Sequence, residues 1–340
     1  MKNLLVLCGG QSPEHPISIR SAKNILKELD STKYKITIVG ISQKGEWRLI
    51  DESDLTDEIT SQGRTVSIHP GHSDLFRCDG KSLGDFDAVF PILHGPNGED
   101  GTVQGLFKLL RLPFVGPGVL GSSISMDKDV TKRLLRDSGM KVAPWKLITA
   151  GEEIPSYKQI AGELGEIVFV KPANMGSSVG VHRVINEADW QAAMSDAFKY
   201  DRRVLVEKSI IGRELECAVL GNENPEATGV GEVRSGDFYS FDEKYASSSH
   251  ADIIIPADIN SKYLPVLKET AIKAYQTLCC EGMSRVDMFL TESGEIYVNE
   301  VNTIPGFTSI SMYPKLWEEA GVSYGDLLDQ LILLAIERGA

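Results

Sequence analysis

The sequence lacks long hydrophobic runs and C-x-x-C cysteine pairs. Its 340 residues include five cysteines, and none of them forms a C-x-x-C pair. An odd number of cysteines without this spacing is typical of reduced thiols in a cytosolic protein and argues against a disulfide framework or structural zinc. No stretch approaches the ~20 apolar residues of a membrane span, and the apolar run at residues 4–8 is too short for a secretion signal. We therefore expect a cytoplasmic protein with no membrane partner.

Basic residues are outnumbered, with 35 Lys and Arg against 48 Asp and Glu. The formal net charge is −13 at pH 7, and no basic run or basic–aromatic patch is present. A nucleic-acid partner would be repelled by this overall field, so we expect none. An anionic small ligand would have to be held by a few local lysines. Hydrophobic residues make up 42% of the chain, which is enough for the cores of the two or three domains that this length predicts.

Apolar strand and helix patterns alternate along the first third of the chain. This alternation predicts a βαβ unit and a parallel sheet. Because ligands of open parallel sheets bind beyond the carboxyl ends of the strands, we expect loops 9–16 and 94–101 to line one edge. The predicted strands are residues 3–8, 35–41 and 88–93, and the predicted helices are residues 17–29 and 102–110.

A Gly/Pro/Ser cluster at residues 115–123 predicts the first domain boundary. A smaller middle unit is expected next, and a last unit contains a polar loop, a hairpin and a terminal helix. The apolar face of that terminal helix indicates core or a subunit contact. The middle unit is predicted to have a helix at 126–138 and strands at 147–149, 167–171 and 203–208, and the last unit a helix around 261–280.

The segment KPANMGSSVGV, residues 171–181, follows an apolar strand and is rich in Gly and Ser. Gly allows close approach of a backbone, and successive amides can form an anion-binding concavity. A phosphate loop with Lys171 as its charge is one interpretation, and a solvent-exposed turn is the other. A second lysine, Lys128, opens a predicted helix. Neither G-x-x-x-x-G-K-[ST] nor G-x-G-x-x-G occurs, so a phosphate-binding protein of this sequence must use another nucleotide fold.

The hairpin at residues 284–302 combines two alternating strands with Ser293-Gly294, a two-residue turn signal. That turn places Asp287 opposite Glu300 and Arg285 opposite Asn302, all on one face of the sheet. Two opposed carboxylates are destabilising unless a cation lies between them, and Mg²⁺ prefers such oxygen ligands. The alternative is an exposed strand face on which the carboxylates pair with Arg285.

Nine motifs, in order, resemble the D-alanine:D-alanine ligases of the ATP-grasp superfamily over almost the whole chain. They are LLVLCGGQSPEHPIS, LHGPNGEDGTVQG, PFVGPGV, SMDK, FVKPANMGSSVGV, VEKSIIGRE, DEKY, RVDMF and NEVNTIPGFTS. The resemblance implies an α/β, three-domain ATP-grasp fold, in which an N-terminal βαβ domain precedes two α+β domains that clamp ATP. The expected domains are 1–117 for substrate, 118–208 as the central ATP-grasp subdomain, and 209–340 with the metal site and a lid loop at 235–250.

The resemblance implies that the carboxylate of one D-alanine attacks the γ-phosphate of ATP to give an acyl phosphate. The amine of a second D-alanine then displaces phosphate. On the substrate side it implies the following roles: Glu14 holds the first ammonium, Ser177 links it to Tyr245, His94 lies near the first carboxylate, Arg285 and the Gly306 N–H stabilise the oxyanion, and Ser311 binds the second carboxylate.

On the nucleotide side the resemblance implies two lysines for the α- and β-phosphates, one for the transferring phosphate, a set for adenosine, and two Mg²⁺ ions or Mn²⁺. These residues are, in turn, Lys128 and Lys171; Lys244; Glu207, Lys208, Ile210 and Glu214; and the metal ligands Asp287, Glu300 and Asn302. From the residues alone, 207–214 is a hinge that could hold a base, and Glu214 could accept from ribose. We also expect a homodimer.

Three alternatives stay open: a D-alanine:D-serine ligase, another ATP-grasp carboxylate–amine ligase, and a non-catalytic two-lobed binder. Tyr245 argues against an ester product, because the D-lactate-forming relatives tend to have histidine in a longer lid. Pro16 and the pair Pro96-Asn97 depart from the family pattern and affect substrate positioning. Residues 42–85 show little resemblance and receive no role. We predict that the lid orders when nucleotide binds and then excludes water.

Overall fold

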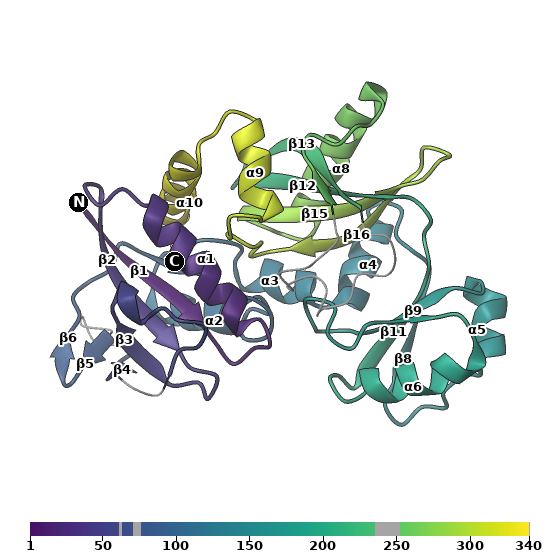
Figure 1. Ribbon diagram of the computed structural model, residues 1–340, viewed down its shortest axis with the longest axis horizontal. Helices are drawn as coiled ribbons and strands as arrows, with labels where there is room; N and C mark the ends of the chain where they lie inside the picture. The colour runs from purple at the N-terminus through teal and green to yellow at the C-terminus, as the bar shows by residue number, and fades with distance from the viewer. Residues whose placement is uncertain (61–62, 71–75, 235–251, 340) are drawn as a thin grey trace.

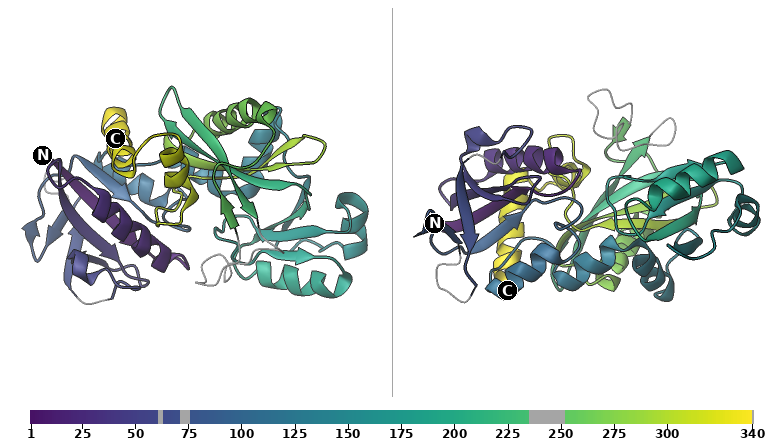
Figure 2. Two further views of the ribbon diagram at one scale, coloured as in Figure 1. Left: turned by 45° about the horizontal axis from the view of Figure 1, so that its top comes forward. Right: turned by 90° about the horizontal axis from the view of Figure 1, so that it is seen from below.

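The computed structural model describes residues 1–60, 63–70, 76–234 and 252–339. Three β-sheets organise these residues, and Figure 1 shows them as separate layers that helices cover and connect. Figure 2 shows the five-stranded sheet between the other two. The lid at 235–250, with Lys244 and Tyr245, lies outside the described residues.

The seven-stranded sheet has the order β6-β5-β4-β3-β2-β1-β7. Strand β1 pairs in parallel with β2 and with β7, so the predicted βαβ unit is confirmed. The strands are β1 Lys2–Gly9, β2 Tyr34–Ile41, β3 Trp47–Ile50, β4 Arg64–Ile68, β5 Phe76–Cys78, β6 Lys81–Ser82 and β7 Ala88–Pro91. Two helices belong to this part of the chain, α1 His15–Glu28 and α2 Thr102–Leu110.

The sheet is mixed because residues 42–85, which had no predicted role, add an antiparallel edge. Strand β3 pairs antiparallel with β2, and β4, β5 and β6 continue the meander. Pro16 lies in the first turn of α1, where a missing N–H costs nothing because the first helical N–H groups have no partner within the helix. This departure from the family pattern is therefore compatible with the local structure.

The other two sheets are antiparallel, with orders β10-β9-β11-β8 and β14-β13-β12-β15-β16. The four-stranded sheet has its own core cluster around the buried Trp190. It comprises β8 Trp145–Thr149, β9 Val168–Pro172, β10 His182–Val184 and β11 Arg203–Lys208, with α5 Tyr157–Leu164 and α6 Glu187–Ala197. The five-stranded sheet comprises β12 Arg213–Gly221, β13 Glu226–Arg234, β14 Asp252–Ile254, β15 Gly282–Leu290 and β16 Ile296–Asn302, with α8 Leu264–Thr277.

The helix predicted over 126–138 is α4 Lys128–Asp137, and a further helix that was not predicted, α3 Val119–Met126, precedes it. Asp127 separates them because its backbone is extended and its carboxylate accepts the N–H groups of Asp129 and Val130, which caps α4. Leu135 of α4 belongs to the core cluster of the five-stranded sheet. Helix α4 therefore packs on that sheet, while its first residue reaches toward the four-stranded sheet.

The hairpin of β15 and β16 has the predicted register at its functional end but a different turn. Asp287 pairs with Glu300 and Arg285 with Asn302, as expected. The two-residue turn is wrong: the Thr291 N–H bonds to the Glu295 carbonyl, so three residues form the loop. An irregularity after Asp287 shifts the register by one residue and compensates for the longer turn.

The terminal helix α10, Tyr324–Arg338, joins the first and last parts of the chain. It contacts α1 and β7 on one side and β12 and β15 on the other. One core cluster accordingly includes Leu4 of β1, Met283 of β15 and Leu331 of α10, together with residues of α9 Met312–Glu319. The apolar face of α10 is thus core, one of the two predicted uses.

Leu331 is 1% exposed and Leu333, on the same helix, is 51% exposed. We predict that Leu331→Ala lowers the free energy of unfolding by about 2–5 kcal/mol, because it opens a cavity in the shared core. Leu333→Ala, the matched control, should change it by less than about 1 kcal/mol. Urea unfolding followed by fluorescence measures both. Equal effects of the two variants would contradict the shared core.

Candidate active site

The carboxylate of Glu14 is a meeting point of three loops. Glu14 precedes α1, is 7% exposed, and accepts a hydrogen bond from the Ser177 hydroxyl in the loop after β9. A Cβ atom on Gly176 would lie 2.9 Å from Glu14 Oε2, and one on Gly95, in the loop after β7, would lie 2.6 Å from the same oxygen. Only glycine fits at these two approaches without moving the carboxylate. The structure thus brings Glu14 and Ser177 together as predicted.

Ser177 reaches Glu14 because the Gly/Ser loop takes an unusual backbone path. Ser177 and Ser178 both have positive φ, 47° and 61°. Residues with a side chain seldom adopt this region, and where they do the surrounding structure holds them, often at functional sites. The loop is therefore a held, specific conformation and not an ordinary exposed turn.

Glu99 is a second carboxyl group at this end, and it ties two loops together. Its Oε2 accepts the Gly95 N–H at 2.7 Å, and its Oε1 accepts the Ile304 N–H at 3.0 Å. Burial raises the pKa of Glu99 to about 8, and the nearby charge of Glu14 adds to that rise. A cation that arrives beside Glu14 and Glu99, such as an ammonium group, would relieve this repulsion.

His94 is buried and fixes the loop that contains Gly306. Its Nδ1 lies 3.0 Å from the Ile304 carbonyl and its Nε2 lies 3.2 Å from the Ser21 hydroxyl, which in turn accepts the Phe307 N–H. Burial lowers the pKa of His94 to about 4, so the ring is neutral near pH 7. Both ring nitrogens are used inside the protein, and in this arrangement His94 positions residues 304–307.

Three lysines surround one buried glutamate between the two antiparallel sheets. Glu207 of β11 is bound by the Lys171 ammonium at 2.9 Å and lies 3.4 Å from that of Lys132. Lys132 is 1% exposed and its Nζ has no hydrogen-bond acceptor within the described residues. The Lys128 ammonium donates to the Met175 carbonyl in the Gly/Ser loop. An anion placed here would find several ammonium groups in a site of low dielectric.

The pKa values of this cluster follow from burial and from mutual charge. Burial alone would raise the pKa of Glu207, but the charges of Lys132 and Lys171 lower it to about 2. Burial lowers the pKa of Lys128 and that of Lys132. Burial opposes the charged form of Lys171 too, yet Glu207 raises its pKa overall. Glu207 therefore stays ionised and keeps Lys171 charged.

The hairpin face carries the predicted oxygen groups, and all of them are largely shielded from solvent. Arg285 binds Asp287 through two hydrogen bonds of 2.7 and 2.6 Å, and its Nε lies 2.9 Å from Glu216 of β12. The Asn302 amide donates to Asp287 at 3.0 Å. Asp287 is 2% exposed, so the alternative of an exposed strand face is wrong, although the pairing with Arg285 that it included is present.

This donor set fits a hard divalent cation in its chemistry. Asp287 and Glu300 are register partners, and the Asn302 amide lies within 3.5 Å of Glu300. Burial raises the pKa of Asp287 to about 7 against the opposing charge of Arg285, so a further positive charge would be favourable. Among the described residues no group of three or more His, Cys, Asp or Glu side chains forms a metal cluster, so the fit depends on two carboxylates and an amide.

The remaining predicted residues lie around these groups. A Cβ atom on Gly306 would lie 2.7 Å from the Ser311 hydroxyl, which accepts the Thr308 N–H at the start of α9. Lys208 is the last residue of β11, and Ile210 lies two residues beyond it. Glu214 is the second residue of β12. Lys244 and Tyr245 fall outside the described residues, so the third member of the predicted triad is not part of this geometry.

Sequence reasoning missed four residues of this region: Glu99, Lys132, Glu216 and Arg203. Lys132 follows Lys128 by one helical turn, so the helix period could have placed both on one face. Glu216 follows Glu214 at strand spacing, which puts both on one face of β12. Nothing local indicates the contact of Glu99 with residue 304, or the ion pairs of Arg203 with Asp127 and Asp129 at the start of α4.

The structure resembles solved ligases over almost its whole length. It is 40% identical to a D-alanine-D-alanine ligase from Coxiella burnetii, with a TM-score of 0.86, and the match covers 99% of this chain and 96% of that one. It is 36% identical to the VanG D-Ala:D-Ser ligase from Enterococcus faecalis, with a TM-score of 0.88 and coverage of 98% and 99%. The fold is therefore the three-domain ATP-grasp fold.

Family and sequence comparisons narrow the class. The family descriptions "D-ala D-ala ligase N-terminus" and "D-ala D-ala ligase C-terminus" match residues 3–117 and 134–333. A D-alanine–D-alanine ligase from Proteus mirabilis is 46% identical, over 98% of this chain and 94% of that protein. D-alanine–D-alanine ligase A from Escherichia coli is 45% identical, over 98% and 96%. The chain belongs to the D-alanine–D-alanine ligase family of ATP-dependent ligases.

We predict that His94 makes stability depend on pH below neutrality. Its pKa is about 4 in the folded protein and 6.5 as the ordinary value, so the unfolded chain binds the proton more tightly. Stability due to His94 is complete above pH 6.5 and is lost as the pH falls toward 4, by roughly 3 kcal/mol. Urea unfolding of the wild type and of His94→Asn across this range, with the difference taken at each pH, isolates this effect.

The difference in unfolding free energy between wild type and His94→Asn should stay constant above pH 7, because the His94 ring is neutral there in both the folded and the unfolded protein. A difference that is also constant between pH 6.5 and pH 4 would contradict a buried, neutral His94.

Proposed function

We propose that this chain joins two molecules of D-alanine into D-alanyl-D-alanine through an acyl phosphate, with conversion of ATP to ADP and phosphate. One observation carries the proposal: the Gly/Ser loop touches an amino-acid site and a phosphate site at the same time. Ser177 binds the carboxylate of Glu14, and two residues earlier Met175 binds the ammonium of Lys128. One short segment of the loop therefore joins the proposed amino-acid site to the proposed phosphate site.

The first step forms the acyl phosphate. Glu14 binds the ammonium of the first D-alanine and so presents its carboxylate to the nucleotide. That carboxylate oxygen attacks the γ-phosphorus, the bond to the ADP oxygen breaks, and the electron pair leaves with ADP. Lys128 and Lys171 bind the α- and β-phosphates, and Lys244 is proposed for the transferring group. Positioning and charge neutralisation supply most of the catalysis in phosphoryl transfer.

The second step forms the peptide bond. Ser311 binds the carboxylate of the second D-alanine, whose amine attacks the acyl carbon. Arg285 and the Gly306 N–H stabilise the tetrahedral oxyanion, and phosphate then leaves with one oxygen of the original carboxylate. Arg285 is held rigidly by Asp287 and Glu216, so its guanidinium needs little reorganisation during this step.

Divalent cations are proposed for the hairpin face. Asp287, Glu300 and Asn302 would hold two Mg²⁺ ions, or Mn²⁺, and the cations would neutralise charge on the phosphates. Glu207, Lys208, Ile210 and Glu214 are proposed to surround adenosine. The lid at 235–250, which lies outside the described residues, is proposed to close over the acyl phosphate and exclude water.

The biological setting is proposed from the same chemistry. The dipeptide product serves peptidoglycan precursor synthesis, and the enzyme is expected to act in the cytoplasm as a homodimer, without nucleic-acid or membrane partners. No helix in the described parts of the chain is long and apolar enough to span a membrane. The proposed domains are 1–117, 118–208 and 209–340.

D-serine as the second substrate is the competing proposal. The VanG D-Ala:D-Ser ligase has a TM-score of 0.88 to this chain, and the Coxiella burnetii D-alanine-D-alanine ligase has 0.86. Fold similarity therefore does not separate the two substrates. We prefer D-alanine because the curated relatives with 45–47% identity carry that name.

Phosphate release from MgATP, with products identified by mass, tests the function. We expect release with D-alanine alone and a dialanine product, and no release with L-alanine. An incubation with D-alanine plus D-serine tests the competing proposal, which predicts that the mixed dipeptide is the main product. If D-alanine caused no phosphate release and only another amine or carboxylate supported turnover, the substrate assignment would be overturned.

We predict that Gly176→Ala weakens binding of the first D-alanine. The new methyl group would lie 2.9 Å from Glu14 Oε2, so the carboxylate must move. A small displacement of a positioning group can cost about 10- to 100-fold, so we expect KM for D-alanine at the first site to rise by at least about tenfold. The KM for ATP should change much less.

Gly105→Ala is the matched control, because Gly105 lies in α2 and a Cβ atom there meets nothing within 4 Å. This control should keep both KM values. An unchanged KM for D-alanine in Gly176→Ala would contradict the proposal that Glu14 binds the ammonium group.

A further inference from the structure

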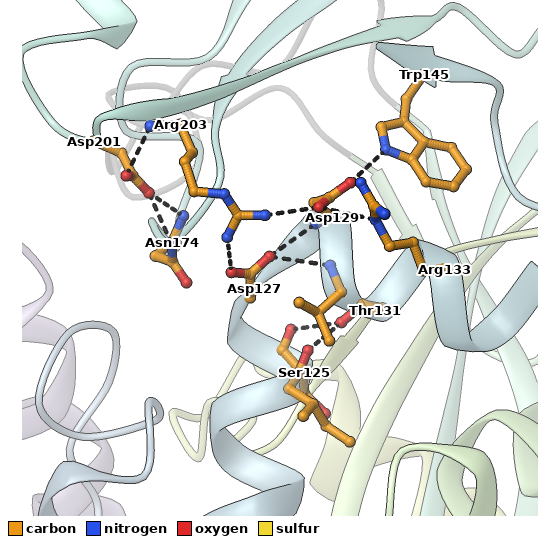
Figure 3. Close-up of polar contacts among 11 residues, drawn as sticks. Ser125, Asp127, Asp129, Thr131, Arg133, Trp145, Asn174, Asp201 and Arg203 are labelled. Atoms are coloured by element: carbon orange, nitrogen blue, oxygen red, sulfur yellow. Dashed lines mark hydrogen bonds and ion pairs between the residues drawn. The ribbon is translucent and has the colours of Figure 1, made fainter. Parts of the chain in front are cut away.

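A network of ion pairs and hydrogen bonds holds Asp127 and Asp129, which precede and follow the first residue of α4, and Figure 3 shows it. It connects that helix to the start of β11 and to the root of the Gly/Ser loop, two elements of the four-stranded sheet. Its labelled members are Ser125, Asp127, Asp129, Thr131, Arg133, Trp145, Asn174, Asp201 and Arg203. None of these residues has a role in the proposed reaction.

Arg203 is the centre of the network. Its Nη1 binds Asp127, and its Nη2 binds Asp129 at 2.7 Å, so the guanidinium spans the residues on either side of Lys128. The planar guanidinium has fixed donors, which lets one arginine hold two carboxylates in a defined geometry. Asp129 is 3% exposed at its side chain and also accepts the Trp145 indole N–H at 2.9 Å. The fork therefore acts on a carboxylate that is already held.

Backbone hydrogen bonds also connect the start of α4 to β11, through the first residue of the Gly/Ser loop. The Ala173 N–H donates to the Arg203 carbonyl at 2.9 Å, and the Ala173 carbonyl accepts the Lys128 N–H at 3.0 Å. Asp201 binds the next residue of the loop, Asn174, through its backbone and its side-chain amide, both at 2.9 Å. Residues 201–203 thus anchor the loop root and the start of α4 separately.

The need for such an anchor follows from packing. The apolar face of α4 packs on the five-stranded sheet, whereas Lys171 and the Gly/Ser loop belong to the four-stranded sheet. Lys128 and Lys171 must nevertheless present their ammonium groups to one polyphosphate. Asp127 and Asp129 also place two negative charges beside Lys128, and without a fixed partner they could compete with phosphate for it.

We propose that Arg203 is a positioning residue for nucleotide binding: its fork on Asp127 and Asp129 fixes Lys128 relative to Lys171 and keeps the two carboxylates away from the phosphates. This inference rests on the proposed function, because it assumes that Lys128 binds ATP. Arg203 itself does not touch the nucleotide. Asp201 anchors the loop independently, so the D-alanine site should be spared when the fork is lost.

Arg203→Lys tests the fork, because lysine keeps the charge and cannot bind two carboxylates in the same plane. Arg133→Lys is the matched control: Arg133 Nε binds the same Asp129 oxygen at 3.0 Å, but its side chain is 56% exposed and Arg133 lies within α4 itself. The readouts are the dissociation constant of a non-hydrolysable ATP analogue, KM for ATP, KM for D-alanine, kcat and the melting temperature. Lys128→Ala serves as the reference for loss of the phosphate contact.

We expect Arg203→Lys to weaken analogue binding and to raise KM for ATP by about tenfold, while KM for D-alanine stays within about twofold. Arg133→Lys should match the wild type. Arg203→Lys with wild-type affinity for the analogue, beside a weakened Lys128→Ala, would overturn the inference alone. A Lys128→Ala enzyme with wild-type affinity would overturn the proposed phosphate site as well.

An equal rise of both KM values, together with a lower melting temperature, would mean that Arg203 only stabilises the fold and would also overturn the inference.

Discussion

The burial of ionised groups between the two antiparallel sheets is the constraint on which the rest of the structure depends. Glu207 holds the ammonium groups of Lys132 and Lys171 in a region from which water is largely excluded. Removing such groups from water is costly, and only mutual charge and hydrogen bonds offset that cost. Within the described residues Lys132 Nζ lies 3.4 Å from Glu207 Oε1 but makes no hydrogen bond, and Lys128 adds a third ammonium group nearby. The polyphosphate that we propose for this site would bring negative charge beside these ammonium groups.

One loop contacts both the proposed substrate site and the proposed phosphate site. The Gly/Ser loop leaves the four-stranded sheet, binds Lys128 and ends against Glu14, which belongs to the first domain. The end of the hairpin opposite its turn supplies oxygen groups from the five-stranded sheet. Each of the three sheets therefore contributes one part of the site, and the shared core around α10 joins the first and last of them. The geometry of the proposed site therefore depends on how the three sheets are placed relative to one another.

The sequence predicted most of this, because its motifs are local. The first βαβ unit, the Gly/Ser loop and the facing pair Asp287 and Glu300 all follow from short-range patterns. The hairpin register was right although its turn was wrong, since an irregularity in the strands offset a longer loop. Contacts between distant segments could not be predicted: Glu99 binds residue 304, and Arg203 binds α4 from 74 and 76 residues away. The strands within residues 42–85 were not predicted for a different reason, because short edge strands show little periodicity in the sequence.

The most direct test of the central claim is the fate of oxygen during turnover. D-alanine labelled with ¹⁸O in its carboxylate is incubated with the enzyme and MgATP, and the released phosphate is analysed by mass spectrometry. An acyl phosphate requires that one labelled oxygen leave with phosphate as the peptide bond forms, so the account predicts labelled phosphate in proportion to dipeptide. Dipeptide formed together with unlabelled phosphate would show that the carboxylate is not activated by phosphorylation and would contradict the account.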